Sequence, residues 1–377
     1  MRDRGGTRDK YTRLASARST SRRCRRCGSS LLFIQRALLK PHEKEKVIAA
    51  AAEAERSSTS RRTRPTTTMA RLPGRPMMTK CACISFCACF GTYVRLYADR
   101  IGPSSNVALQ GSFLANSVGS FALGLFSSSD RDSTSDAWYA GMTVGFCGSF
   151  TTYSGWNLRV ARAALGQISG APSGAVVAVV AIVTSLAFFA ACFAAGGDLV
   201  KEVTSRGRRV GFVGFLGGRG NNDDVRGAVG MLGAVYALLA ILLAVDNSWS
   251  RRIDWVACMF APFGALSRFY LSRKLNSRCR DGAFPLGTFT ANVVGSLVMA
   301  LVFYGVRTSS SLTTGWNNVV IRAFQAGFLG SLTTMSTFVS EVVGHRDRYS
   351  PLASYSYLAA TAIAALAPAL IVGATLK

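Results

Sequence analysis

The sequence predicts an all-α polytopic membrane protein of nine spans, in which one linker helix joins two inverted four-helix repeats. Two observations support this fold class. The chain has 377 residues, is 49% hydrophobic, and contains several apolar runs of about 20 residues after residue 78. One stretch also occurs twice. Residues 145–154 read GFCGSFTTYS and residues 327–336 read GFLGSLTTMS, so seven of ten positions are identical.

The first repeat is expected over residues 79–196 and contains three motifs in order. Its four spans lie at about 80–97, 107–126, 138–158 and 174–195. The first span contains Gly91-x-x-x-Arg95, the second contains GSFLANSVGS, and the third contains the first copy of the duplicated stretch. The fourth is a long apolar run, which completes a unit of four candidate membrane helices.

The second repeat is expected over residues 252–377, after a basic loop (197–227) and a lone apolar helix (228–247). Its spans lie at about 255–272, 284–305, 320–342 and 355–375. They contain Gly264-x-x-x-Arg268, GTFTANVVGS and the second copy, at offsets of 173, 176 and 182 residues from the first repeat. Four spans return the chain to its starting side, so the added linker span inverts the second repeat.

Charge placement predicts the orientation. Residues 1–78 are rich in Arg, Ser and Thr and are expected to form a disordered cytosolic tail. A transit peptide, or a later start at Met69 or Met77, stays open. The basic loops fall on the side of the tail, which predicts a cytosolic N-terminus and an external C-terminus. This placement explains the net charge of +25 without a nucleic-acid partner.

Each copy of the duplicated stretch carries two glycines and two adjacent threonines in the middle of an apolar span. This composition predicts a helix that is interrupted inside the membrane. Such an interruption is tolerated only where the backbone is buried in protein or lines an ion path. Unpaired carbonyls are therefore expected near the midplane, over residues 148–151 and 330–333.

Polar groups at matching positions predict an anion path. Asn116 and Asn292 lie mid-span at corresponding positions, and an amide offers two N–H donors without adding a charge. Hydroxyl groups would continue the path: Ser112, Ser120, Thr288, Ser296, Thr152, Thr334, Ser154 and Ser336. Hydrogen bonding or close packing between helices is the alternative for a single copy. Recurrence of the asparagine in both copies favours the path.

Two arginines at corresponding positions allow two interpretations. Arg95 and Arg268 fall near the ends of their predicted spans. They could attract anions at a vestibule, or they could extend to the interface and pair structurally.

Other function classes find less support. The run Cys81, Cys83, Cys87 and Cys89 suits the start of an apolar helix better than a metal site, and Cys24-x-x-Cys27 has no second ligand pair. His42 and His345 fall in the tail and a loop without a catalytic constellation, so no enzyme is expected. An inverted-repeat secondary transporter for a small ion or drug is the main alternative. Its only candidate carboxylate is Glu341, which has no counterpart in the first copy.

The paired motifs resemble those of the Fluc/FEX fluoride channel family, the CrcB-like proteins. The match extends to Ser336-Thr337-Phe338-Val339-Ser340-Glu341 and covers about residues 79–377 apart from the loop and linker. The resemblance implies a single-chain pseudo-dimer in the plasma membrane that conducts fluoride passively out of the cytosol and confers fluoride resistance. No organic cofactor is expected. The resemblance also implies a structural Na⁺ held by the carbonyls of Gly148, Thr151, Gly330 and Thr333.

The chain departs from the family pattern in its aromatic residues. Family members carry two phenylalanines three residues apart after the threonine pair, whereas this chain has Tyr153 and Trp156 in one copy and Met335 and Phe338 in the other. The resemblance implies that each pore takes one position from each repeat. One pore would be lined by Tyr153 and Phe338 and its twin by Met335 and Trp156. Methionine has no aromatic edge for an anion, so the first pore is expected to carry most of the flux.

Overall fold

All regular structure in the described part of the chain is helical. The computed structural model describes residues 75–101, 112–130, 135–169, 172–206, 225–276, 284–307 and 310–376. Most of the expected tail (1–78) and of the basic loop (197–227) lies outside these residues, as do Met69, Cys24, Cys27 and His42.

The first half of the described chain contains a long helix, a shorter one, an interrupted helix and two further long helices. Their bounds are α4 (Arg75–Ile101), α5 (Phe113–Ser128), α6 (Asp136–Ala140), the π-helix η2 (Gly141–Cys147), α7 (Gly148–Phe150), α8 (Tyr153–Ala164), α9 (Ala175–Ser205) and α10 (Val225–Val245). The elements α6 to α8 make up the interrupted helix, and α10 is the linker.

The second half repeats this order. Its elements are α11 (Trp249–Leu275), α12 (Leu286–Arg307), the 3₁₀-helix η5 (Ser310–Leu312), α13 (Gly315–Ala323), the π-helix η6 (Phe324–Leu329), α14 (Gly330–Leu332), α15 (Met335–Arg348) and α16 (Pro351–Thr375). The elements α13 to α15 form the second interrupted helix. His345, which was expected in a loop, lies near the C-terminal end of α15, together with Arg346 and Arg348.

Helix lengths differ from the expected spans at several ends. Five of the described helices are long and apolar enough to cross a membrane, namely α4, α9, α10, α12 and α16. Helix α9 continues to Ser205, so the first residues of the expected 197–227 loop are helical. Helices α4 and α11 are both longer than predicted, because hydropathy falls where charged residues occupy their ends. The outward faces of α9, α10 and α16 carry exposed valine, leucine and isoleucine, which suits a lipid environment.

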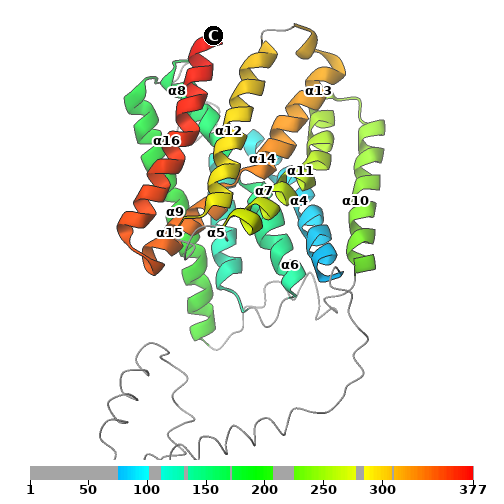
Figure 1. Cartoon of the computed structure of the whole chain (residues 1–377). Helices are drawn as coiled ribbons and strands as arrows, with labels where there is room; N and C mark the ends of the chain where they lie inside the picture. The colour runs from blue at the N-terminus through cyan, green and yellow to red at the C-terminus, as the bar shows by residue number, and fades with distance from the viewer. Residues whose placement is uncertain are drawn as a thin grey trace, which may run out of the picture. The chain divides into compact units, whose positions relative to one another are not determined.

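The two interrupted helices meet in the middle of the bundle, where α7 and α14 lie close together, while α10 lies at its edge (Figure 1). The glycine of each G-x-x-x-R motif allows the neighbouring helices to approach. A Cβ on Gly91 would overlap the Phe146 carbonyl of η2, and one on Gly264 would overlap the Phe328 carbonyl of η6. Each first helix therefore packs directly on the backbone of an interrupted helix.

The linker helix is joined to the second repeat through Asp246, just after α10. Its carboxylate accepts hydrogen bonds from Arg251 Nε (2.6 Å), Ser248 N (2.9 Å) and Trp255 Nε1 (3.1 Å). These hydrogen bonds hold the start of α11 against the end of α10.

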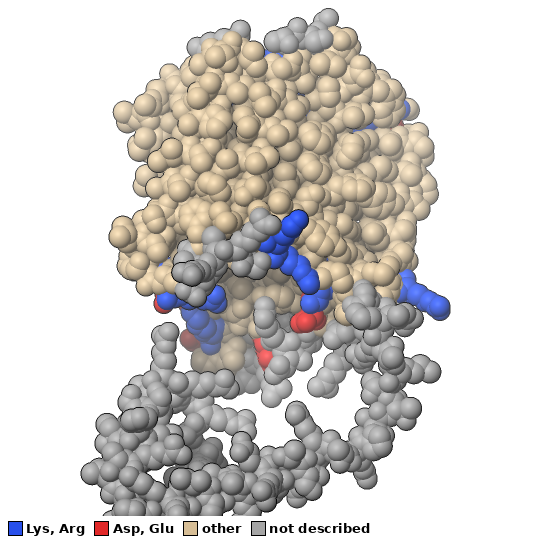
Figure 2. Space-filling model, in the orientation of Figure 1, with Lys and Arg blue, Asp and Glu red and all other residues tan. Residues whose placement is uncertain are grey.

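Charged side chains are unevenly distributed over the described surface. On the face shown in Figure 2, Lys and Arg gather at the end of the bundle where α6 begins and α9 ends, and the wall above is largely free of charge. This distribution is typical of a protein embedded in a membrane with a basic side.

Candidate ion pathway

Both interrupted helices break at their threonine pairs, Thr151–Thr152 (the first break) and Thr333–Thr334 (the second break). Thr151 and Thr152 have extended backbones, with φ, ψ of −99°, 151° and −139°, 132°, and the second break repeats these angles closely. The second threonine of each pair caps the helix that follows, because its hydroxyl accepts from the backbone N–H three residues later. The interruption expected from sequence is therefore present in both copies.

The two breaks contact each other through buried hydroxyl groups. Thr151 Oγ1 lies 3.2 Å from Thr334 Oγ1 and 3.0 Å from Ser336 Oγ. On the other side, Thr333 Oγ1 lies 3.2 Å from the hydroxyl of Thr152. Thr333 Oγ1 also lies 2.9 Å from the hydroxyl of Ser154. The crossing thus brings together polar side chains about 180 residues apart in an otherwise apolar bundle.

Each predicted asparagine holds the backbone of its own break. Asn116 Nδ2 donates to Thr152 O (3.1 Å), and Thr152 N donates to Asn116 Oδ1 (2.9 Å). Asn292 pairs in the same way with Thr334, at 3.2 Å and 2.9 Å. Both side chains are fully buried. Each amide nitrogen donates one of these hydrogen bonds and carries a second N–H that can donate to a further acceptor.

This pairing leaves backbone carbonyls without donors. In a continuous helix Thr152 N would donate to Gly148 O, but here it donates to Asn116. The same holds for Gly330 O in the second break. The carbonyls of Thr151 and Thr333, at the extended residues, also lack a donor in the described ranges. These are the four oxygens that the family resemblance implies for a cation.

The two motif arginines are buried inside the bundle, each 2% exposed, rather than at helix ends. Arg95 donates to the carbonyls of Ser149 and Ala326. Arg268 donates to Ser331 O (3.2 Å) and Val144 O (2.9 Å). The lengthened α4 and α11 account for this, since each arginine lies more than one turn before the end of its helix.

A cavity of about 380 Å³ leads to the first break. It lies at the C-terminal end of α4, and Arg95, Asp99, Thr152, Gly155 and Arg322 are among the residues that line it. We refer to it as the Arg95 cavity. An ion pair between Arg100 and Asp254 (2.5 Å) joins α4 to α11 on its wall. The Arg95 cavity therefore extends from the first break toward the end of the bundle where α4 ends, and the Arg95 guanidinium lies on its wall.

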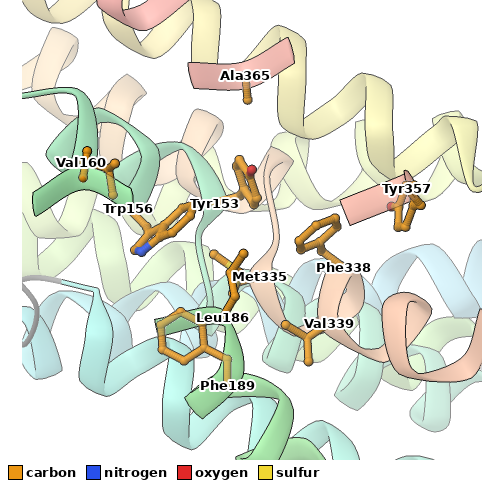
Figure 3. Close-up of a cluster of buried hydrophobic side chains, with 11 residues drawn as sticks. Tyr153, Trp156, Val160, Leu186, Phe189, Met335, Phe338, Val339, Tyr357 and Ala365 are labelled. Atoms are coloured by element: carbon orange, nitrogen blue, oxygen red, sulfur yellow. The ribbon is translucent and has the colours of Figure 1, made fainter. Parts of the chain in front are cut away.

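The aromatic residues that follow the breaks form one buried cluster with Met335 (Figure 3). Tyr153 and Phe338, from different repeats, are in edge contact with ring centroids 5.4 Å apart and an interplanar angle of 82°. Tyr153 also meets Trp156 edge-on at 5.3 Å. The cross-repeat pair expected for one pore is therefore in contact, and Met335 and Trp156 belong to the same cluster.

Sequence reasoning missed Tyr357, a polar residue beside this cluster. The Tyr357 hydroxyl donates to Glu341 Oε2 (2.8 Å), and the Thr288 hydroxyl donates to Oε1 (2.7 Å). The Tyr357 ring also packs on Phe338, with centroids 5.3 Å apart. One signal was present: Tyr357, Thr361 and Ala365 recur every four residues and form a fully buried stripe on an otherwise apolar helix.

Helix α9 supplies a second polar partner to the aromatic cluster, because Trp156 Nε1 donates to Ser185 Oγ (3.1 Å). Among the other predicted hydroxyls, Ser112 is buried at the start of α5. Ser120 and Ser296, at corresponding positions, have buried oxygens without a partner in the described part of the chain. Asp99 and Asp254 are further carboxylates within helices, so Glu341 is not the only one that a coupled transporter could use.

Comparison with known proteins finds one family twice. The family described as CrcB-like protein, Camphor Resistance (CrcB), matches residues 82–197 and again residues 255–374. No solved structure matches the chain.

Curated relatives carry fluoride in their names. Fluoride export protein 1 of Candida albicans is 38% identical over 129 residues, which is 32% of each chain. Fluoride export protein 1 of Neurospora crassa is 28% identical over 239 residues, 56% of this chain and 43% of the relative. The Fluoride-specific ion channel FluC of Vibrio campbellii is 42% identical over 76 residues, 20% of this chain and 56% of the relative. Each match spans less than two thirds of the relative's length.

Proposed function

The chain belongs to the CrcB-like protein family, and from that premise we propose that it is a fluoride-selective channel through which fluoride leaves the cytosol passively. The family match agrees with the resemblance found in the motifs, and relatives are named fluoride export proteins and fluoride-specific channels. In this proposal the protein acts in transport rather than as an enzyme. Its cellular effect is resistance to fluoride that enters as HF and is trapped as the anion.

The proposed topology has nine spans. Residues 79–196 and 252–377 form four-span repeats of opposite orientation, and residues 228–247 form the linker span between them. The duplicated motifs and the odd connector support this arrangement. The N-terminus would be cytosolic and the C-terminus external, with the plasma membrane as the site of action. One chain then supplies both halves of the pathway.

One observation carries the proposal: buried polar groups from two broken helices meet inside an apolar bundle. A scaffolding protein would gain nothing from two desolvated breaks, because each buried polar group must find a partner. Fluoride is small and strongly hydrated, so a pathway must replace its water with fixed donors. The second amide N–H groups of Asn116 and Asn292 and the hydroxyls at the breaks supply such donors without a permanent charge.

The aromatic edges continue this path. Ring hydrogens carry partial positive charge, so the edges of Tyr153 and Phe338 can face an anion after it leaves the hydroxyl groups. We assign the main pore to this pair and the weaker one to Met335 and Trp156. Arg95, at the cavity that leads to the first break, and Arg268, at the corresponding position, would raise the local concentration of anions.

A structural Na⁺ fits the donor set at the crossing. Gly148, Thr151, Gly330 and Thr333 offer carbonyl oxygens without other donors, and oxygen ligands suit a small hard cation. When bound, the ion would neutralise the partial negative charge of these oxygens and hold the breaks together. The asparagines, the hydroxyl groups and the aromatic edges would still provide the contacts to the anion.

A coupled transporter is the second candidate, because Glu341 is partly buried and accepts hydrogen bonds from Thr288 and Tyr357 beside the aromatic cluster. A carboxylate in such a place could exchange a proton during transport. The two mechanisms differ in what drives the flux, since flux through a channel follows the electrochemical gradient of the anion and needs no proton gradient.

The test is efflux from liposomes that contain the purified protein. Vesicles loaded with potassium fluoride or potassium chloride receive a potassium ionophore, with equal pH on both sides, and an electrode records the released anion. The proposal predicts that fluoride leaves rapidly and that chloride stays. Release of chloride at a comparable rate would contradict the selectivity, and fluoride release only under a pH gradient would favour the coupled transporter.

A further inference from the structure

We propose that Arg95 and Arg268 are positioning residues that join the two repeats and fix the place of the helix breaks, and that Gly148 and Gly330 are glycines in order to admit them. The inference deepens the proposed function and rests on it, because it takes the helix breaks to be part of the fluoride pathway. It assigns these arginines a role that depends on the shape of the guanidinium group as well as on its charge.

The contacts of Arg95 cross the boundary between repeats. The residue lies on α4 of the first repeat and donates to Ser149 O, in the last turn before the first break. Its other terminal nitrogen donates to Ala326 O, in η6 of the second repeat. One planar group therefore connects the backbones of both interrupted helices.

Arg268 repeats this arrangement in the opposite direction. From α11 of the second repeat it donates to Ser331 O, before the second break, and to Val144 O in η2 of the first repeat. The acceptors correspond: residues 144 and 326, and residues 149 and 331, are each separated by the offset of the duplicated stretch. The four hydrogen bonds therefore form a pseudo-symmetric pair of links.

The acceptors are available because the helices are interrupted. A carbonyl in the last turn of a helix has no helical donor, which applies to Ser149 and Ser331. A buried guanidinium in turn needs hydrogen-bond acceptors, since an unpartnered buried charge is strongly unfavourable. Each group thus satisfies the other, and the fork of the guanidinium sets the spacing between two backbones.

The glycines give an independent sign of the same contact. A Cβ on Gly148 would overlap the guanidinium of Arg268, and one on Gly330 would lie within 3.0 Å of three guanidinium atoms of Arg95. Each arginine therefore lies against the glycine at the break of the other repeat. The space at these positions is taken by a side chain from the opposite repeat, so a Cβ there would have to displace the buried guanidinium from its hydrogen bonds.

The first experiment separates shape from charge. Arg95→Lys and Arg268→Lys keep the positive charge but lose the fork, because one ammonium group cannot reproduce two donors in a fixed plane. Arg273→Lys, on the exposed end of α11, is the matched control. Each variant is reconstituted so sparsely that many vesicles lack protein. The fraction of vesicles that release fluoride then reports folded protein, and the rate in those vesicles reports conduction.

We expect both buried variants to lower the rate per active vesicle at least tenfold, while the control keeps the wild-type rate. Wild-type rates in both buried variants would overturn the proposal, since charge alone would then suffice.

The second experiment measures the coupling without transport. The thermal midpoint of the purified full chain is compared for Gly148→Ala, Arg268→Ala and the double variant. We expect Gly148→Ala to lower the midpoint strongly in the wild-type background and to have little further effect once Arg268 is removed. Equal effects of Gly148→Ala in both backgrounds would overturn the steric link. Because this readout needs no ion, it decides the proposal even if the protein proves not to conduct fluoride.

Discussion

The two helix breaks share a backbone and differ in the side chains around it. Both have the same extended dihedral angles, the same pairing with an asparagine and the same arginine contact across the repeats. The residues that follow differ between the copies, with Tyr153 and Trp156 after the first break and Met335 and Phe338 after the second. The backbone contacts at the breaks are therefore alike in the two copies, whereas the side chains that follow the breaks differ.

A smaller difference concerns the serine hydroxyl beside each break, which, among the described residues, has a hydrogen-bond partner only at the second break. Ser331 Oγ lies 3.0 Å from the Thr92 hydroxyl of the first repeat. The residue that corresponds to Thr92 is Ala265, and the Ser149 hydroxyl is buried without a partner in the described part of the chain. One side of the crossing therefore has a cross-repeat hydrogen bond that the other lacks.

The largest expected effect is that of a bulky residue at either break. Gly148→Val or Gly330→Val should abolish fluoride efflux, because the new side chain overlaps the arginine of the other repeat. Thr151→Val, which keeps the volume but loses the hydroxyl, should cost about 1–3 kcal/mol by leaving Ser336 N unsatisfied. Efflux and thermal unfolding of these variants measure the difference. If Gly148→Val and Gly330→Val were tolerated as well as Thr151→Val, the two breaks would not share this backbone requirement.

The asparagines test whether the two breaks are equivalent. Asn116→Asp or Asn292→Asp cannot donate to the threonine carbonyl and adds a negative charge beside the anion. Each variant should suppress conduction and lower the free energy of unfolding by about 1–3 kcal/mol. The loss should be similar in the two copies. The double variant should conduct nothing. Normal flux through a well-expressed double variant would mean that the amides serve packing alone.

The aromatic positions test where the two copies have diverged. Phe338→Ile removes the ring edge that meets Tyr153, whereas Trp156→Ile alters the second pore that we propose, the one with Met335. We expect the phenylalanine change to reduce the rate of fluoride efflux severalfold more than the tryptophan change, with both proteins folded. The reverse order would assign the flux to the other pore.

The smallest effect concerns the unequal serines. Thr92→Ala should lower stability by about 1 kcal/mol, because Ser331 then loses its partner. Ala265→Thr offers Ser149 the same hydrogen bond and should raise stability by a similar or smaller amount. Thermal midpoints of the two variants give the comparison. Destabilisation by Ala265→Thr would show that the first break has no room for the missing contact.

Much of the fold could be predicted because the chain contains each signal twice. Two copies of GFxGSxTT in apolar spans predicted that both helices are interrupted. The extended residues are Thr151–Thr152 and Thr333–Thr334, whereas residues 148–150 and 330–332, which were expected inside the breaks, are helical. The depth of the arginines could not be predicted in the same way. Hydropathy ended the first span near residue 97, so Arg95 was placed at a helix end, although α4 continues to Ile101. Asp99 was missed for the same reason.

The partners of the site residues were harder to predict than the residues themselves. Asn116 was identified from its recurrence, but its pairing with a backbone 36 residues away depends on how α5 packs on the break. Tyr357 lies early in an apolar helix, where a tyrosine is usually an interface residue. Only the packing of α16 against α15 brings it to Glu341 and Phe338.

The most direct test of the whole account compares anions and variants in one assay. Voltage-driven efflux of fluoride and of chloride is measured at equal pH from vesicles that contain the wild-type chain or the Asn116→Asp, Asn292→Asp double variant. The account predicts that wild-type vesicles release fluoride and retain chloride, while vesicles with the folded double variant retain both. Comparable release of chloride by the wild type, or undiminished fluoride release by the double variant, would contradict fluoride conduction through the crossing of the two breaks.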